Sequence, residues 1–490
     1  MRVYFLEAII SPTPKSAPSN TPQLARDLRV SHATAVVVGT IIGSGIFLVP
    51  AEMMRAVGTA KLVYLAWIVG GILSFLGALT YAELGAMKPQ SGGEYVYVRD
   101  AYGPLMSFLY AWSWFVIAKP GSMATIATGM MQILGGYPAL SFLPKNVVSG
   151  VPFTYAQLAA VALIIFISAV NYIGVKKAGQ FQVVFTVLKL AIIFGVIVVG
   201  FFAGHGSWSN FTTSFTGATG GIAGFMIALV AALWAYDGWN DINMVAEEID
   251  HPERNVPIAL IVGVGIVAAL YMLLNAAVQY ALPAQAIAMS KRAASDAVLV
   301  SIGAGAASIF AALMAIQMLA TINGTTLSGA RIPYALARDG YFFEAIGKVH
   351  PRYLTPANAI VFQGALAVIL VSLVGKFQQL FSLTIFAEWL FYMIATSTVF
   401  VFRRREPNAN RPYKTWGYPV VPAVFIAAAA MLLCYTFVDN LKYAMIPTTL
   451  IGPPLNSIST GGALVILLGV PVFWWFARQK SLTTKGTKEL

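Results

Sequence analysis

Two runs of small and polar residues interrupt apolar stretches of this chain. The first is Gly-Ser-Gly at 43–45, and the second is Asp-Gly-Trp-Asn at 237–240. Such residues are weak helix formers, and a broken helix leaves backbone N–H and C=O groups without partners. Because buried unpaired groups are costly, each break is a candidate site for a polar ligand.

The two breaks offer opposite charges to such a ligand. A half-helix that begins after Gly45 directs free N–H groups and the positive end of its dipole at the gap, which favours a carboxylate. The half-helices that end at Ile41 and Ile42 and at 234–236 present unpaired carbonyls, which favour an ammonium group. An α-amino acid carries both groups close together, so the pattern predicts an amino acid site.

Helix packing is the simpler interpretation, since Gly39 and Gly43 have the small-xxx-small spacing of close helix contacts. That spacing does not explain three consecutive small residues. It also leaves the second break unexplained, which lies in the first segment of a second putative five-segment unit. Paired breaks in two halves of a chain indicate the binding site of a secondary transporter.

The segments that hold these breaks are long enough to cross a membrane. Of the 490 residues, 58% are hydrophobic and 10% are charged, whereas soluble domains have about 25% charged residues. A bilayer needs roughly 20 apolar residues per helix. The sequence therefore predicts an all-α polytopic membrane protein with 12 transmembrane helices, at 34–57, 62–87, 104–134, 152–174, 178–203, 221–246, 257–281, 297–330, 356–374, 379–402, 418–438 and 456–478.

The basic residues predict the orientation. With both termini cytoplasmic, the inner segments hold 22 Lys and Arg residues and the outer segments hold seven, as the positive-inside rule requires. We therefore expect a multi-pass protein of the cell (cytoplasmic) membrane. Its net charge of +12 faces an anionic leaflet and needs no nucleic acid. The single cysteine, Cys434, permits no intramolecular disulfide.

Five motifs identify a family resemblance. The chain resembles the L-type amino acid transporter group of the amino acid–polyamine–organocation (APC) superfamily, in the bacterial type without a heavy subunit. The resemblance implies alternating access and a 5+5 inverted repeat (LeuT-like) with discontinuous helices 1 and 6, plus two C-terminal helices. The motifs are GTIIGSGIF, AYDGWN followed by AEEI, NGTTLSGARIPYALARDG, RPYKTWGYP and GVPVFWWFARQK.

The same resemblance implies a division of the chain. A cytoplasmic tail precedes two five-helix repeats, and a cytoplasmic loop with helices 11 and 12 precedes a second cytoplasmic tail. The parts are, in that order, 1–33, 34–203, 221–402, 403–478 and 479–490.

By position in the motifs, the resemblance also implies the substrate-binding residues. The carboxylate-binding amides fall on Gly43, Ser44 and Gly45. The amine-binding carbonyls fall on Ile41, Ala235 and Asp237, and Trp234 takes the place of an aromatic gate. Family members usually have Phe at the gate, and animal members have Gly at position 237, so the pocket differs in volume and charge.

Two lysines lie inside expected spans. Lys189 is about ten residues into the fifth span, and a buried ammonium must find carbonyls or a carboxylate. Sodium-coupled relatives of this fold bind Na⁺ between the first and eighth helices, and L-type members place a lysine there. We expect Lys189 to replace sodium, with carbonyls near Gly39 and Thr40 and hydroxyls near Ser328 as partners. Lys119 matches a family arginine and holds the third helix to the bundle.

Four other polar residues keep two or more interpretations. Asp237 either contacts a substrate amine or caps the second half-helix. Glu388 is a proton carrier, a pocket wall or a surface group. Tyr236 lines the pocket or packs, and Asn323 is a ligand or bonds across helices.

Other classes of protein fit the sequence less well. An enzyme would need a cluster of catalytic or metal-binding residues, a receptor would need a signalling domain, and a channel would need repeated filter motifs. We find none of these in the sequence. No cofactor is expected. The alternative function is a proton-coupled amine, polyamine or cationic amino acid symporter. The loop at about 135–151 lacks the cysteine that joins animal L-type carriers to a glycoprotein, so no disulfide-linked heavy subunit is expected.

Overall fold

The computed structural model describes residues 28–90, 92–147, 153–173, 178–203, 206–353, 355–444 and 457–486. Helices dominate these residues, and the described part contains isolated β-bridges but no β-strand. The expected N-terminal tail lies largely outside the described residues, as does part of the loop at 135–151. Most of the expected C-terminal tail, 479–490, continues the last helix, which ends at Gly486.

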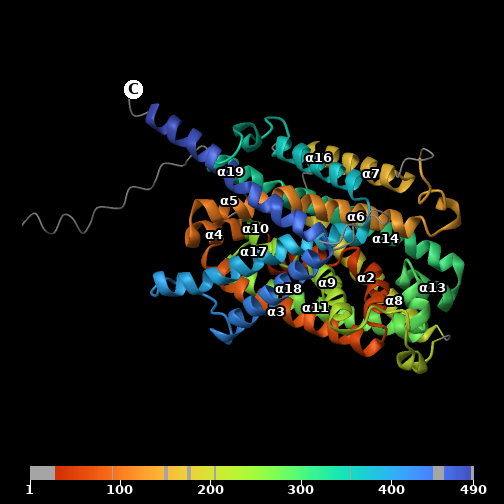
Figure 1. The fold of residues 1–490 in the computed structure, drawn as a ribbon. Coiled ribbons are helices and arrows are strands. Elements are labelled where there is room, and N and C mark those ends of the chain that lie inside the picture. The colour runs from red at the N-terminus through yellow and green to blue at the C-terminus, as the bar shows by residue number, and fades with distance from the viewer. Residues whose placement is uncertain are drawn as a thin grey trace, which may run out of the picture.

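The α-helices follow one another along the whole described chain (Figure 1). They are α1 (Val30–Ile41), α2 (Gly45–Val57), α3 (Ala60–Met87), α4 (Glu94–Tyr102), α5 (Pro104–Ser113), α6 (Lys119–Leu134), α7 (Tyr155–Ile173), α8 (Ala178–Phe202), α9 (Gly221–Tyr236), α10 (Asp241–Met244), α11 (Pro252–Ala281), α12 (Ala284–Met289), α13 (Ala293–Ile302), α14 (Ala304–Gly329), α15 (Arg331–Arg338), α16 (Ala357–Leu373), α17 (Phe377–Arg405), α18 (Val420–Ala444) and α19 (Ser457–Gly486).

Ten segments in the described residues are long and apolar enough to cross a membrane, which agrees with a polytopic membrane protein. Two expected spans are not among them. The span at 104–134 is divided by a π-helical turn, Trp114–Ala118, between α5 and α6. The span at 356–374 corresponds to α16, which has 17 residues. The count of twelve and the inverted repeat therefore stay predictions.

Both helix breaks occur where the sequence places them. The first segment is divided between α1, which ends at Ile41, and α2, which begins at Gly45. The sixth is divided between α9, which ends at Tyr236, and the short α10, which begins at Asp241.

The broken helices lie between two groups of continuous helices (Figure 1). On one side, α11 packs against α3 and α8, and it contacts the broken segment through α1. On the other side, α6 packs against α14, α7, α16 and α17. The halves α2 and α9 pack directly on each other, so the two breaks are brought together in the interior.

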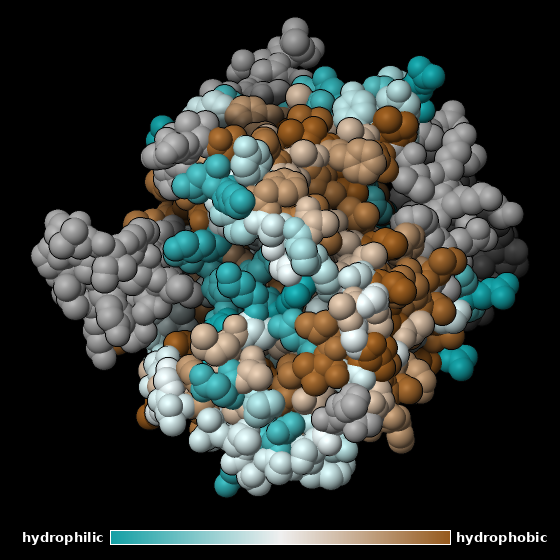
Figure 2. Space-filling view, turned by 90° about the vertical axis from the view of Figure 1, so that its right-hand side faces the viewer, coloured by the Kyte–Doolittle hydropathy of each residue, from teal (hydrophilic) through white to brown (hydrophobic). Residues whose placement is uncertain are grey.

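Hydrophilic residues gather at the centre of the molecular face that carries α13, with hydrophobic residues above and to the right of them (Figure 2). Many large apolar side chains are exposed on the long helices, among them Phe166 of α7, Phe194 of α8 and Leu467 of α19. Lipid is the solvent that suits such apolar sides, while polar residues suit the helix ends that meet water.

Candidate substrate site

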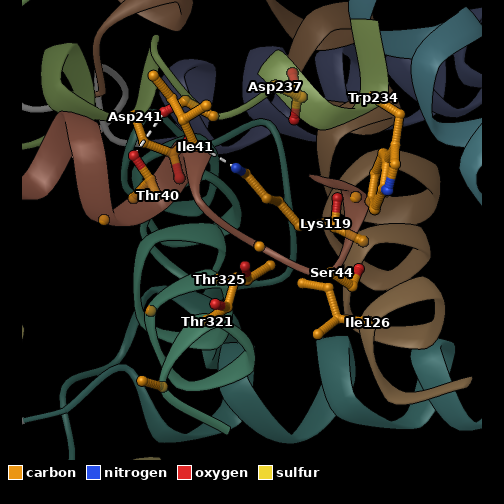
Figure 3. A pocket seen from close by; sticks show the side chains of 17 residues that line it. Thr40, Ile41, Ser44, Lys119, Ile126, Trp234, Asp237, Asp241, Thr321 and Thr325 are labelled. Carbon is orange, nitrogen blue, oxygen red and sulfur yellow. Dashed lines mark hydrogen bonds and ion pairs between the residues drawn. The ribbon is translucent and has the colours of Figure 1, made fainter. Parts of the chain in front are cut away.

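A cavity of about 50 Å³ lies between the two breaks and the helices α6 and α14 (Figure 3). It is large enough for roughly four water molecules, at ~10–15 Å³ each. A second cavity, of about 300 Å³, lies between α2, α9, α17 and α18 and has a mainly apolar lining without any residue of the breaks. The smaller cavity is the candidate site because free backbone groups converge on it. Its lining includes Gly39, Thr40, Ile41, Gly43, Ser44, Gly45, Lys119, Ser122, Ile126, Trp234, Asp237, Gly238, Asp241, Ala320, Thr321, Gly324 and Thr325.

The first break presents the start of α2 to the cavity. Because α2 begins at Gly45, the N–H groups of Gly45 and Ile46 precede its first intrahelical hydrogen bonds, while that of Phe47 donates to the Ser44 carbonyl at 3.3 Å. Ser44 is 1% exposed, and its hydroxyl oxygen has no hydrogen-bond partner among the described residues. The three predicted amide positions, Gly43, Ser44 and Gly45, all line the cavity.

Gly45 permits a close contact between the two broken helices. A Cβ atom at this position would lie 2.8 Å from the Ala235 Cα atom, which is backbone and cannot rotate away. A Cβ at Gly43 would meet the Thr321 side chain at 3.6 Å, an ordinary contact. Glycine is therefore required at position 45 by packing, and at position 43 it is not.

The second break contacts the first directly. Gly238 has a φ of +100°, a region that favours glycine. The Thr40 hydroxyl donates a hydrogen bond of 2.9 Å to the Gly238 carbonyl. Asp237 has an extended backbone, and its carboxylate accepts a 2.7 Å hydrogen bond from the Tyr392 hydroxyl of α17. The N-cap of α10 is Asn240, so the expectation that Asp237 caps this helix is wrong.

Tyr271 of α11 joins the carbonyls of both breaks. Its hydroxyl lies 3.1 Å from the Ile41 carbonyl oxygen and 3.0 Å from that of Ala235. These are two of the carbonyls expected to receive a substrate amine. The sequence analysis did not single out Tyr271. The available signal was a tyrosine inside an apolar span, because a buried hydroxyl requires a partner.

Lys189 of α8 uses all three of its N–H donors. The ammonium donates to the Gly39 carbonyl at 2.6 Å, the Ile42 carbonyl at 2.9 Å and the Thr321 hydroxyl at 2.8 Å. Lys189 therefore joins the first break to α14. The hydroxyl partner was expected near Ser328, but it is Thr321, and the Ser328 hydroxyl lies 3.4 Å from an Asp241 carboxylate oxygen.

A buried ion pair crosses one side of the cavity (Figure 3). The Lys119 ammonium of α6 lies 2.7 Å from the Asp241 carboxylate at the start of α10, and both side chains are almost fully buried. The pair links α10, at the second break, to α6. This agrees with the expectation that Lys119 holds its own helix to the bundle. Asp241 was missed, although an acidic residue in the first turn of a half-helix is a recognisable signal.

The remaining predicted site residues occupy different places. Trp234 lines the cavity and stacks on Phe381 of α17, with ring centroids 6.1 Å apart. Tyr236 lies outside the lining, where its ring packs against Trp67 and Tyr271. Asn323 also lies outside the lining and accepts a 2.8 Å hydrogen bond from Asn171 of α7. The structure thus places Tyr236 in packing and Asn323 in a bond between helices.

An apolar helical protein with a ligand cavity between two broken helices has the architecture of a secondary membrane transporter. Comparison with known families agrees. The family model described as amino acid permease matches residues 28–470. The chain belongs to this amino acid permease family, which consists of transporters and not enzymes.

Individual relatives cover most of the chain. The human b(0,+)-type amino acid transporter 1 is 33% identical over 86% of this chain and 84% of its own length. The serine/threonine exchanger SteT of Bacillus subtilis (strain 168) is 30% identical over 94% of this chain and 98% of its own length. The mouse Asc-type amino acid transporter 1 is 31% identical over 92% of this chain and 81% of its own length. The resemblance to L-type amino acid transporters is thereby confirmed.

Proposed function

We propose that the protein exchanges small neutral L-amino acids across the cell membrane by alternating access, without sodium. The supporting observation is the pair of breaks around one cavity. The start of α2 offers N–H groups to the substrate carboxylate, and the carbonyls of Ile41 and Asp237, which both line the cavity, offer acceptors to its amine. Ala235, the third predicted carbonyl, lies outside the lining, and its oxygen accepts from Tyr271. The relatives named as amino acid transporters and exchangers support the same substrate class.

The size of the cavity supports small substrates. Its volume of about 50 Å³ holds only roughly four water molecules. Alanine and serine have few heavy atoms beyond the zwitterion itself. A larger side chain would require Trp234, which stacks on Phe381 at the cavity wall, to move.

The position of Lys189 supports sodium independence. Its ammonium already donates to two carbonyls and a hydroxyl around the first break, which are ligands that a sodium ion also prefers. A second cation about 4 Å away would be repelled by ~4 kcal/mol at an effective dielectric constant of 20. A sodium ion is therefore excluded while Lys189 is charged.

The experiment is counterflow in proteoliposomes. Liposomes loaded with unlabelled alanine should accumulate labelled alanine, serine or leucine, and empty liposomes should not. Replacing Na⁺ by choline at constant pH should leave the rate unchanged. A steep sodium dependence would refute the role of Lys189, and equal uptake into empty liposomes would refute exchange.

A cationic amino acid or amine is the second candidate substrate. The observation that favours it is Asp237, an acidic residue of the cavity lining. Counterflow with putrescine and L-arginine tests it directly. If a diamine drives counterflow and neutral amino acids do not, the protein is a transporter of amines and the proposal of neutral substrates is wrong.

We also propose that both termini are cytoplasmic and that the chain works without a disulfide-linked subunit. The excess of basic residues on the expected inner side supports the orientation, and the absence of cysteine from 135–151 supports the second point. Protease digestion of tags at each terminus in sealed vesicles tests the first. Transport by the purified single chain tests the second.

A further inference from the structure

Glu388 of α17 is a buried carboxyl group without a hydrogen-bond donor. The side chain is 0% exposed, and neither carboxyl oxygen has a partner among the described residues. An isolated carboxylate in such a place is very costly. Either the group is neutral or a cation must compensate it.

The nearest charged groups do not supply that compensation. The Glu388 carboxyl faces Asp237 at the second break, and both act on Lys119 of α6. Lys119 is already paired with Asp241 of α10 at 2.7 Å. Glu94 of α4 adds a further carboxyl to the surroundings. One lysine thus faces several acids, and two adjacent buried carboxyls cannot both be ionised cheaply.

The contacts of Tyr392 distinguish the two members of the pair. Tyr392 lies one helical turn after Glu388 on the same face of α17, and its hydroxyl approaches the Asp237 carboxylate at 2.7 Å and the Asn240 amide oxygen at 2.9 Å. Asp237 therefore receives a donor, as an ionised carboxylate requires. Glu388 has no donor among the described residues, so of the two neighbouring carboxyls it is the one that must be neutralised by a proton.

We propose that Glu388 holds a proton while Asp237 is ionised, and that this proton is released when a substrate with a cationic side chain binds. The inference rests on the proposed exchange and extends it to cationic amino acids, for which Asp237 must face the substrate and Trp234 must move from the cavity wall. One positive charge enters the cavity and one proton leaves through Asp237 to water on the open side. When a neutral amino acid replaces the cation, Glu388 takes the proton back.

The proposal has a consequence for charge movement. A cationic amino acid enters without the proton, and a neutral amino acid leaves with it. One cycle therefore moves the cation inward and the neutral substrate and a proton outward, with no net charge. Without Glu388 the same exchange would move one positive charge per cycle.

The experiment measures L-arginine uptake into proteoliposomes loaded with alanine, under a potassium diffusion potential. A factor of ten in accumulation corresponds to ~59 mV for one charge. In the wild type, 59 mV negative inside should leave arginine accumulation unchanged, and an interior more acidic by one pH unit should raise it about tenfold. In Glu388→Gln the two responses should change places. The potential of 59 mV should raise arginine accumulation about tenfold, and the pH difference should leave it unchanged.

Two controls keep the outcomes distinct. Glu344→Gln removes an exposed carboxyl and should behave as the wild type. Proton release in weakly buffered detergent solution needs no variant: L-arginine should release about one proton per molecule bound, and alanine none.

Three results would overturn the proposal. The first is a tenfold rise of arginine accumulation in the wild type at 59 mV, and the second is arginine binding without proton release. The third is a wild type that exchanges alanine but does not bind arginine. If alanine exchange itself is absent from the wild type, the proposed function is wrong as well.

Discussion

The close contact at Gly45 makes a quantitative prediction. Non-bonded carbon atoms rest at about 3.5–4.0 Å, so the methyl group of Gly45→Ala, 2.8 Å from the Ala235 Cα, is at least ~0.7 Å too close. Such overpacking typically costs ~1–3 kcal/mol. Because the strain acts where α2 meets α9 to close the cavity, we expect the Kd for alanine to rise roughly 5- to 150-fold.

The assay is equilibrium binding of labelled alanine to purified protein, with thermal unfolding measured in parallel. The matched control is Gly43→Ala, whose Cβ would make only a 3.6 Å contact with Thr321. We expect its Kd within about threefold of the wild type, since ordinary contacts carry little strain. Equal losses in the two variants would refute the argument from helix contact, and so would wild-type binding in Gly45→Ala.

Three further predictions concern single side chains. Tyr271→Phe leaves two buried carbonyls without their common donor, at a cost of ~1–3 kcal/mol. Its alanine affinity should fall about tenfold in the binding assay, and an unchanged Kd would contradict the link. Lys189→Ala removes the connection between α8, the first break and α14. This variant should slow counterflow more than it weakens equilibrium binding. If the variant transports at the wild-type rate, Lys189 contributes only to packing. Burial raises the pKa of Glu94, on the segment between α3 and α5, from 4.5 to about 7, while an Asn240 hydrogen bond opposes the shift. A raised pKa stabilises the folded protein below pH 4.5, and this contribution is lost as the pH rises through 7. The unfolding temperature of the wild type relative to Glu94→Gln should therefore fall between pH 5 and 8, and a constant difference would contradict it.

The sequence predicts the local features of this protein well. Helix breaks depend on nearby residue types, so the runs at 43–45 and 237–240 appear in the structure where they were expected. Long apolar segments likewise predict membrane helices. The π-helical turn Trp114–Ala118 was not predicted, because nothing in its composition differs from an ordinary apolar helix.

Contacts between distant helices were harder to predict. Lys189 was placed beside the first break with the help of the family resemblance, yet its hydroxyl partner is Thr321 and not one near Ser328. The rotation of α14 about its axis decides between them, and the sequence does not fix that rotation. The links from Tyr271 to two carbonyls and from Lys119 to Asp241 depend on how α11 and α6 pack around the breaks.

The hydrogen bonds between the two breaks bear on leakage. Thr40 is joined to the Gly238 carbonyl, and Tyr271 is joined to a carbonyl of each broken helix. A displacement of one break is therefore transmitted to the other, and the two do not open independently. A continuous water-filled passage would require both to separate at once. In the proposed exchange, such linked breaks would let amino acids cross the membrane while its ion gradients stay intact.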